Sequence, residues 1–314
     1  TLTSGWLTTG PKTKSFEEAF SSYIGCKHAI ALNSCTAGLN LALAMHGFSE
    51  GDEVITTPMT FPATANIVLL QKMNPVLVDI EPGTLLIDPK KIEEKITPRT
   101  RAIIPVHFAG HPCDMRAIND LAEKYKLLVI EDAAHALETK YKGKKIGNMG
   151  NITSFSFYAN KNITTGEGGM VVTNDGVLAK QFQTMRLQGI SRDAWKRYGK
   201  SGYTHWEQTM AGHKCNMTDI NASIGIHQLK KIDLFLNIRR KYVAMYDHGF
   251  ADVPEIETLV CHDKVDHAHH LYIIALRLEQ LTIDRDGFLD AMQKSGIGVA
   301  AVSYTHLRAH ETDS

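Results

Sequence analysis

Short apolar runs alternate with amphipathic stretches along the first half of this chain. The runs that predict strands span residues 28–32, 53–56, 76–80, 102–106 and 127–131. Strands that are joined through helices enter one sheet in parallel, with right-handed crossovers. The pattern therefore predicts an α/β fold with a mainly parallel sheet and helices on both faces. Residues 154–158 and 169–173 are predicted to add two further strands.

The length of 314 residues exceeds one average domain, and a hydrophobic content of 43% is sufficient for a substantial core. Thr218 or Asp219 can cap a long helix. The apolar side chains of this helix are Ile220, Ile224, Leu229, Ile232 and Leu236. We expect it to join a large domain over residues 1–234 to a smaller α+β domain over residues 235–302, with a strand at 271–276.

Charge and cysteine content limit the classes of function. With 34 basic and 34 acidic residues, the sequence has no electrostatic signature for a nucleic acid polymer or an anionic membrane. The five cysteines are scattered and never form C-x-x-C, which argues against a disulfide framework and a thiolate zinc site. No leader pattern is visible, and no apolar segment approaches the ~20 residues that span a bilayer. We expect a cytoplasmic protein that acts on small molecules.

An open parallel sheet binds its ligands beyond the carboxyl ends of its strands, and Asp132 ends one predicted strand while Thr36 and Phe61 follow two others. Lys161 precedes a glycine-rich turn, and Asp132 ends a buried strand. A desolvated lysine is partly neutral and can capture an aldehyde, while a buried carboxylate needs a cation such as a protonated pyridine nitrogen. The alternatives are an exposed surface lysine and a helix cap formed by Glu131 or Asp132.

A phosphate site is predicted where residues 33–38 follow a strand and open a helix. The unpaired amides of Thr36 and Ala37 can receive a phosphate with help from the helix dipole. Ser156, in a predicted strand, can add a hydroxyl group. The alternatives are a Ser/Thr cap on a structural helix and a small buried strand residue.

Two more side chains are candidates for contact with a pyridine ring. His135 lies one helical turn after Asp132 and can donate to a phenolic oxygen on such a ring. Phe61 can stack on the face of the ring. Either residue can instead be ordinary packing.

These segments form part of an ordered set of motifs. The others are Ser-Gly-Trp-Leu-Thr-Thr-Gly-Pro at 4–11, Gly-Asp-Glu-Val-Ile-Thr-Thr-Pro at 51–58 and Asn-Met-Thr-Asp-Ile-Asn-Ala at 216–222. On this set the chain resembles the DegT/StrS family of pyridoxal-phosphate-dependent sugar aminotransferases, over residues 4–299. The resemblance implies the fold-type I architecture, with a large cofactor-binding domain and a smaller domain. It also implies truncation at both ends, and residues 303–314 are predicted to be a non-native tail.

The resemblance implies a role for each residue around the ring. Lys161 would form the imine with pyridoxal phosphate and move protons, and Asp132 would hold the pyridine nitrogen. His135 would lie near the ring oxygen, at a position where relatives often have Gln, and Phe61 would cover the ring face.

It likewise implies that the phosphate is held by Thr36, Ala37 and Ser156. Family members are homodimers in which a Gly-x-x-x-Asn-Met segment reaches the partner's cofactor phosphate. That segment is residues 212–217 here, so Lys214 is the implied donor to the partner. His213 and Cys215 stand where relatives usually have aromatic residues.

The implied reaction passes an amino group from glutamate or glutamine through the cofactor to a keto group of a nucleotide-linked sugar. Residues 188–195 favour the C4 keto position, in cell-surface polysaccharide or amino-sugar biosynthesis. One alternative is a dehydratase that uses the same cofactor, although Lys161 stands where such an enzyme has histidine. Another is a regulator that binds the cofactor without turnover. A nicotinamide enzyme is disfavoured, because no G-x-G-x-x-G lies between a strand and a helix.

Imidazole and thiol groups crowd together in residues 261–270 and raise the question of a metal site. Their spacing matches no standard zinc pattern, and His267, His269 and His270 would point to alternate faces of an extended chain. We therefore expect no metal, and a solvated segment that leads into the strand at 271–276.

Overall fold

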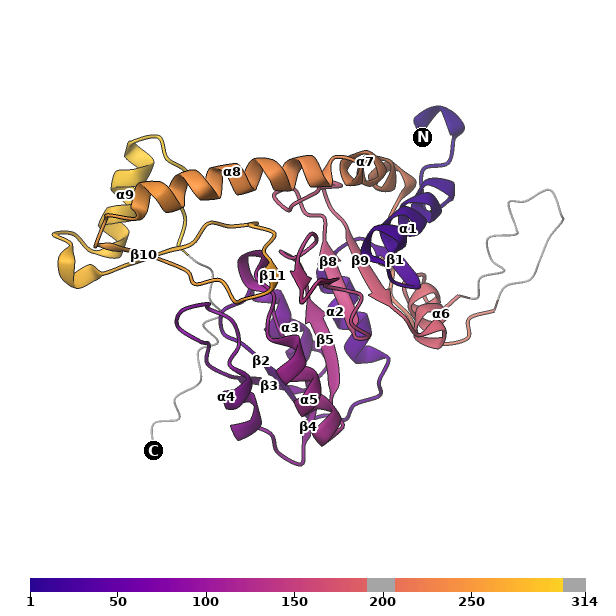
Figure 1. Ribbon diagram of the computed structural model, residues 1–314. Helices are drawn as coiled ribbons and strands as arrows, with labels where there is room; N and C mark the ends of the chain where they lie inside the picture. The colour runs from indigo at the N-terminus through magenta and orange to yellow at the C-terminus, as the bar shows by residue number, and fades with distance from the viewer. Residues whose placement is uncertain (191–206, 302–314) are drawn as a thin grey trace.

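The computed structural model describes residues 1–190 and 207–301, with a seven-stranded sheet at its centre in the order β1-β9-β8-β5-β4-β2-β3 (Figure 1). Its strands are β1 (His28–Leu32), β2 (Glu53–Thr56), β3 (Asn74–Leu77), β4 (Thr100–Ile103), β5 (Leu128–Asp132), β8 (Ile152–Ser156) and β9 (Gly169–Thr173). Strand β9 is antiparallel to β1 and β8, and the other pairs in this sheet are parallel. The predicted α/β class with a mainly parallel sheet is confirmed.

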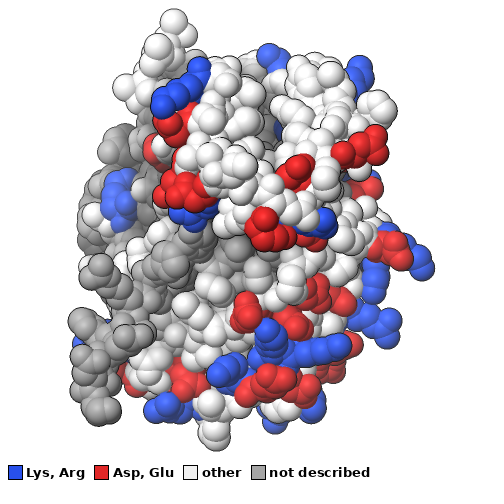
Figure 2. Space-filling model, turned by 90° about the vertical axis from the view of Figure 1, so that its left-hand side faces the viewer, with Lys and Arg blue, Asp and Glu red and all other residues white. Residues whose placement is uncertain are grey.

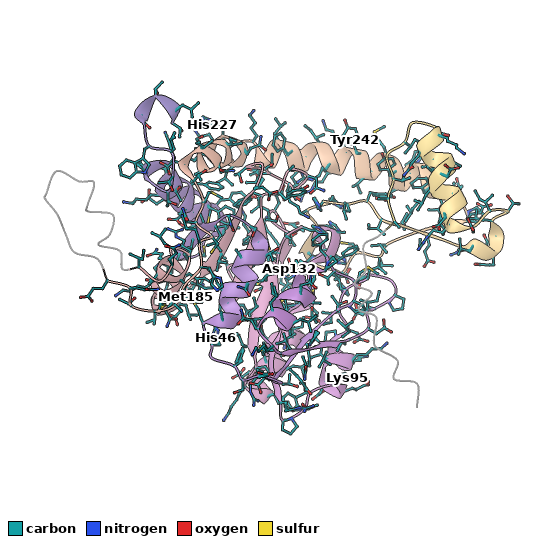
Figure 3. All side chains as sticks on the ribbon, turned by 180° about the vertical axis from the view of Figure 1, so that it is seen from behind. His46, Lys95, Asp132, Met185, His227 and Tyr242 are labelled. Carbon is teal, nitrogen blue, oxygen red and sulfur yellow. The ribbon has the colours of Figure 1, made fainter. Side chains whose placement is uncertain are left out.

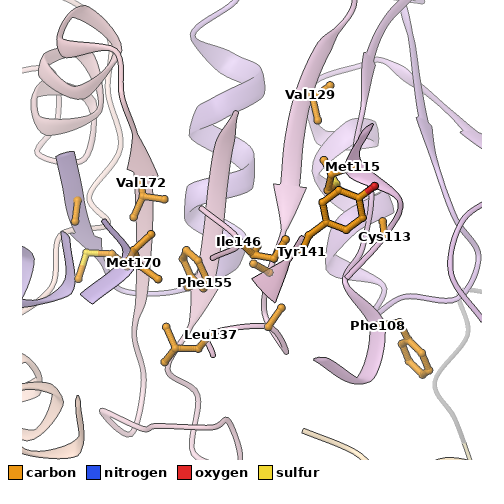
Figure 4. Packing of buried hydrophobic residues seen from close by; sticks show 14 of the residues in the cluster. Phe108, Cys113, Met115, Val129, Leu137, Tyr141, Ile146, Phe155, Met170 and Val172 are labelled. Carbon is orange, nitrogen blue, oxygen red and sulfur yellow. The ribbon is translucent and has the colours of Figure 1, made fainter. Parts of the chain in front are cut away.

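Helices cover both faces of the sheet because alternate strand residues point to opposite sides. Ile130 packs in a core with α2 (Cys35–Ala44), α3 (Ala63–Leu70) and α6 (Gly176–Met185). Val129, the preceding residue, packs in a second core, part of which is shown in Figure 4. The helices of that face are α1 (Pro11–Ile24), α4 (Pro89–Glu94), α5 (Met115–Tyr125) and α7 (Asp219–Leu229).

The predicted strand bounds hold at 28–32, 53–56 and 169–173. The other predicted strands begin and end about two residues earlier in the structure, except β5, which moves by one residue in the other direction. The apolar run outlasts the hydrogen-bonded ladder in these cases: Ile80 and Val106 form only isolated bridges beyond β3 and β4. Buried apolar residues therefore mark the position of a strand better than its last residue.

The predicted long helix is two helices, α7 and α8 (Ile232–Phe250), separated by Lys230 and Lys231. Thr218 caps α7, because its hydroxyl oxygen accepts from the amide of Asn221 at 3.2 Å. Helix α8 crosses above one end of the sheet (Figure 1). The proposed domain boundary at residues 234/235 falls inside α8 and stays a prediction.

Two of the motifs found in the sequence meet in space. Helix α1 begins after Gly10, which has no side chain to cap it. The carboxylate of Asp219 replaces the cap, because it accepts from the amides of Gly10 at 2.7 Å, Lys12 at 3.0 Å and Thr13 at 2.8 Å. Asp219 thereby fixes the start of α1 against the start of α7.

Short elements complete the chain. They are η1 (Leu2–Ser4), η2 (Phe108–Gly110), β6 (Lys140–Tyr141), β7 (Lys144–Lys145), β10 (Ile256–Thr258), β11 (Val265–Asp266), β12 (Ile274–Leu276), η4 (Leu278–Gln280) and α9 (Arg285–Lys294). Strand β11 pairs with β6 and ties the C-terminal part to the loop after β5. The strand predicted at 271–276 is present only as β12. The tail predicted at 303–314 lies outside the described residues.

The surface has no dominant charge on the face in Figure 2, where acidic and basic side chains are interspersed. None of the helices within residues 1–190 and 207–301 combines the length and the apolar character needed to cross a membrane.

Candidate active site

Asp132 is the last residue of β5 and is 6% exposed, near the middle of the molecule (Figure 3). It points to the same side of the sheet as Ile130, toward α2 and α3. Oδ2 accepts a hydrogen bond from the Thr64 hydroxyl at 2.8 Å, and Oδ1 accepts from the amide of Ala134 at 3.1 Å. Sγ of Cys35, the first residue of α2, lies 3.9 Å from Oδ1. The carboxylate is thus held firmly by neutral donors.

Lys161 follows β8, the neighbour of β5 in the sheet, and its amide donates to the carbonyl of Tyr158 at 3.0 Å. Its side chain lies within electrostatic reach of Asp132 and Cys35. Burial lowers the pKa of Lys161, while the Asp132 carboxylate acts in the opposite direction. The structure therefore brings together the two residues on which the predicted chemistry depends.

The pKa of Asp132 changes in the complementary direction. Burial raises it, and the hydrogen bond from Thr64, that from Ala134 and the charge of Lys161 only partly oppose this change. Dehydration thus favours the neutral form of both groups. A neutral amine is the form that attacks an aldehyde, and a protonated ring nitrogen would stabilise the Asp132 carboxylate. Lys161 and Asp132 therefore fit a phosphorylated pyridine aldehyde.

The start of α2 forms the predicted phosphate site, with one difference from expectation. Ser34 caps the helix and its hydroxyl oxygen accepts from the Ala37 amide at 3.1 Å, so this amide already has a partner. Thr36 is exposed. A Cβ on Gly169 would lie 2.3 Å from the carbonyl carbon of Ser34, so only glycine permits this close approach.

Ser156 belongs to the same place because it is paired with Gly169 across β8 and β9. Its hydroxyl accepts from the amide of Tyr158 at 3.3 Å, and the residue is half-buried. Ser156 is therefore the strand partner of a glycine that closely approaches the backbone at the start of α2, where an anion could be bound.

His135 packs against a residue that sequence reasoning did not connect with it. Its ring stacks on that of His270, with centroids 4.3 Å apart. Nδ1 of His135 accepts from the amide of Ala109 at 3.3 Å, which leaves the proton of the neutral ring on Nε2. Burial, the charge of His270 and that of Lys161 lower the pKa of His135 to about 2. His135 is therefore a neutral group with a donor available at Nε2.

Phe61 and Lys214 are both at the surface. Phe61 is 68% exposed and precedes α3, three positions before Thr64. Lys214 is exposed and its ammonium group bonds to the side chain of Asn216. Asn216 forms a bridge with Leu32 at the end of β1, close to the start of α2. The roles predicted for Phe61 and Lys214 stay predictions.

Two contacts of this site were missed in the sequence. Thr64 donates a hydrogen bond to Asp132. The sequence could have indicated Thr64, because it lies one helical turn after Phe61 in the same Thr-Phe-Pro-Ala-Thr segment. His270 covers His135, and no local pattern shows this, because the two lie in separate parts of the chain. Residues 191–195 of the segment that favoured the C4 position lie outside the described residues.

Residues 265–270 of the histidine-rich segment are half-buried or buried, so the interpretation as a solvated lead-in is wrong for this part, while residues 261, 263 and 264 are exposed. The rings of His267 and His269 stack at 4.4 Å, and His267 lies 5.3 Å from His111. His270 turns to the other side, onto His135. Within residues 1–190 and 207–301, no three His, Cys, Asp or Glu side chains are arranged to hold a metal ion. The cause of the burial is the packing of this segment on residues 109–111.

A mainly parallel sheet covered by helices on both faces, with a lysine and a buried carboxylate close enough to influence each other's charge, fits an aminotransferase. The chain belongs to the DegT/DnrJ/EryC1/StrS aminotransferase family, whose model matches residues 1–312.

Two relatives and one solved structure support this assignment. An uncharacterized protein of Methanocaldococcus jannaschii, MJ1066, is 51% identical over 99% of this chain and 80% of its own length. The spore coat polysaccharide biosynthesis protein SpsC of Bacillus subtilis is 45% identical over 93% of this chain and 75% of its own. The putative sugar aminotransferase Spr1654 of Streptococcus pneumoniae, in its PMP form, has a TM-score of 0.89 at 34% identity, over 96% of this chain and 80% of that one.

Proposed function

We propose that this chain is a pyridoxal-phosphate-dependent aminotransferase. It moves an amino group from glutamate or glutamine to the C4 keto group of a nucleotide-linked sugar, for polysaccharide or amino-sugar biosynthesis. The observation that carries the proposal is that the partly buried Lys161 amine lies within electrostatic reach of the buried Asp132 carboxylate, which ends β5. The S. pneumoniae sugar aminotransferase, solved in PMP and PLP forms, supports the cofactor and the substrate class. The name of SpsC supports the pathway type.

Each residue would act in a definite way. When bound, the cofactor supplies an electron sink for the amino-acid carbon. Asp132 would keep the proton on the ring nitrogen, and Thr64 and Ala134 would keep Asp132 oriented. Nζ of Lys161 would take the proton from the α-carbon of the amino donor and later deliver a proton to the carbon of the sugar that receives the amino group. Nε2 of His135 would donate to the ring oxygen.

The phosphate would be held at the start of α2 by Thr36, Ala37 and Ser156. The amide of Ala37 donates to the Ser34 hydroxyl. The Ser34 side chain would therefore have to rotate away before the amides of Thr36 and Ala37 could both bind the phosphate. In a homodimer, Lys214 would extend to the phosphate site of the partner, since it is exposed and its segment runs beside β1. Phe61 would fold over the ring from the mouth of the site.

The test is transfer of labelled nitrogen. The purified chain with pyridoxal phosphate, glutamate or glutamine labelled with ¹⁵N in the α-amino group, and a nucleotide-linked 4-keto sugar should yield a ¹⁵N-amino sugar, detected by mass spectrometry. Lys161→Ala should bring the rate close to background. Arg116→Ala is a matched control, because Arg116 is an exposed cation on α5 that pairs with Asp120 four residues on.

The other outcomes identify the alternatives. Loss of water from the sugar without nitrogen transfer would indicate a dehydratase. Cofactor binding at Lys161 without any change in the sugar or the amino acid would indicate a regulator. Either result would contradict the proposed function.

A further inference from the structure

A group of three polar residues, two of them buried and the third half-buried, lies beside the site and takes no part in the chemistry proposed above. Glu138 is 3% exposed, and its two carboxylate oxygens have different partners. Oε1 pairs with the guanidinium group of Arg239 on α8, and Oε2 accepts from the side-chain amide of Asn162. Arg239 reaches Glu138 across the gap between α8 and the loop after β5.

One end of this group is attached to the lysine. Asn162 is the residue directly after Lys161, and it is 9% exposed. Its Nδ2 donates to Glu138, whereas its Oδ1 has no hydrogen-bond partner within the described part of the chain. The orientation of the Asn162 side chain therefore depends on Glu138. Since consecutive residues share a rigid peptide unit, this contact also restricts where Lys161 can lie.

The other end is attached to the histidine that covers His135. Nε of Arg239 donates to the carbonyl of Ala268 at 3.0 Å. Ala268 is fully buried and lies two residues before His270, whose ring stacks on His135. Arg239 thus contacts both the loop beside Lys161 and the segment that covers His135.

We propose that Arg239, Glu138 and Asn162 form a positioning relay that fixes Lys161 and couples its position to α8 and to the segment carrying His270. The three are positioning residues, because they act through Lys161 and His270. The inference rests on the proposed function, since it assigns the relay to the lysine of that reaction.

The electrostatics make this relay sensitive to the loss of one member. Burial raises the pKa of Glu138, and the charge of Arg239 is the largest opposing effect, followed by the hydrogen bond from Asn162. Without Arg239, the carboxylate is left buried without a cation, and it either takes up a proton or moves toward water. Both responses change the acceptor that orients Asn162.

The experiment measures the reactivity of Lys161, both toward pyridoxal phosphate and in the cofactor-free chain. The rate of adduct formation with pyridoxal phosphate is followed by absorbance, and the pKa of Lys161 in the cofactor-free chain is measured by competitive labelling with acetic anhydride. Asn162→Ala keeps the Arg239–Glu138 pair and so should fold. We expect Asn162→Ala and Arg239→Gln each to slow adduct formation about 10- to 100-fold, as displacement of a reacting group does, and to shift the labelling pKa of Lys161.

Two further variants complete the design. Adding Glu138→Gln to Arg239→Gln should recover most of the rate, because the amide oxygen it introduces still accepts from Asn162 and carries no charge. Arg240→Gln is the control, since Arg240 is the next residue on α8, is exposed, and forms no hydrogen bond with Glu138 among those identified.

Equal adduct rates and equal labelling pKa values in the parent chain, Asn162→Ala and Arg239→Gln would overturn the relay alone. Slowing by Arg240→Gln to the same extent would also overturn it, because a general effect of charge on α8 would then account for the result. If the parent chain forms no adduct at Lys161, the proposed function fails, and the relay with it.

Discussion

Glu131 and Asp132 are consecutive carboxylates at the end of β5, yet their surroundings differ. Glu131 is fully buried on the α5 side, where Oε2 lies 2.9 Å from Nε2 of His107 and Oε1 accepts from the Asn151 side chain at 2.9 Å. Nδ1 of His107 accepts from the amide of Cys113, so the His107 proton is on Nε2 and is donated to Glu131. Asp132 faces the other side, with Lys161 as its neighbouring cation.

The difference separates a structural carboxylate from a binding one. Both carboxylates have a donor on each oxygen, but Glu131 is enclosed by the side chains of His107 and Asn151, whereas Asp132 lies within electrostatic reach of Lys161. Burial raises the pKa of Asp132, and the charge of Lys161 opposes this only in part, so a positive ring nitrogen would stabilise the carboxylate further. One strand therefore carries both functions, because adjacent residues face opposite sides of the sheet.

The largest effect is expected from Asp132→Asn. The amide is almost the same size but cannot stabilise a positive ring nitrogen, so amino transfer should fall by about 10²–10³-fold, the range for loss of one electrostatic group in an active site. Folding should change little, because burial already favours the neutral form of Asp132. Steady-state kinetics measure the rate of amino transfer, and thermal unfolding measures stability. If Asp132→Asn lost as much stability as Glu131→Ala, the distinction between a binding and a structural carboxylate would fail.

Glu131→Ala should reduce stability and leave the chemistry at Lys161 intact. It leaves buried donors on His107 and Asn151 without an acceptor, and the free energy of unfolding should fall by about 2–4 kcal/mol. Denaturant titration measures this change. At temperatures where the variant is folded, the adduct at Lys161 should still form. Loss of the adduct in a folded variant would show that Glu131 also serves the site.

Thr64→Val should act only on Asp132. The substitution removes the hydrogen bond that Thr64 donates to Oδ2. This hydrogen bond lowers the pKa of Asp132, so its loss should raise that pKa further. A hydrogen bond to a charged group contributes about 1.5–3 kcal/mol, so retention of pyridoxal phosphate should weaken about 10-fold or more. Equilibrium dialysis measures the loss. Thr153→Val is the matched control, because the buried hydroxyl of Thr153 has no hydrogen-bond partner within the described residues. Equal losses in both variants would contradict the assignment.

The smallest effect concerns pH and the histidine-rich segment. Burial and the charges of neighbouring histidines lower the pKa of His267 to about 2. At about pH 5 the unfolded chain binds a proton there and the folded chain does not, so stability should fall as pH drops below about 6.5, by up to about 1.4 kcal/mol per unit for each such histidine. Urea unfolding between about pH 7 and pH 5 should show a shallower slope for His267→Gln, and an unchanged slope would contradict the burial of this ring.

Sequence patterns predicted the sheet well because its strands are buried on both faces and separated by amphipathic helices. Asp132 was found because it ends a strand, where ligands bind in such a sheet, and Lys161 because it precedes a glycine-rich turn in a distinctive motif. The contact of His270 with His135 and the bonds of Glu138 were not predicted, since they join segments far apart in sequence through loops. The histidines were placed in solvent because local polarity does not show which segment packs over them.

The most direct test is to locate the covalent bond. The chain is incubated with pyridoxal phosphate, reduced with borohydride, digested and mapped by mass spectrometry, with Lys161→Ala treated in parallel. We predict one dominant phosphopyridoxyl modification, on Lys161, and its absence from the variant. Modification of another lysine at equal yield in both proteins would contradict the account.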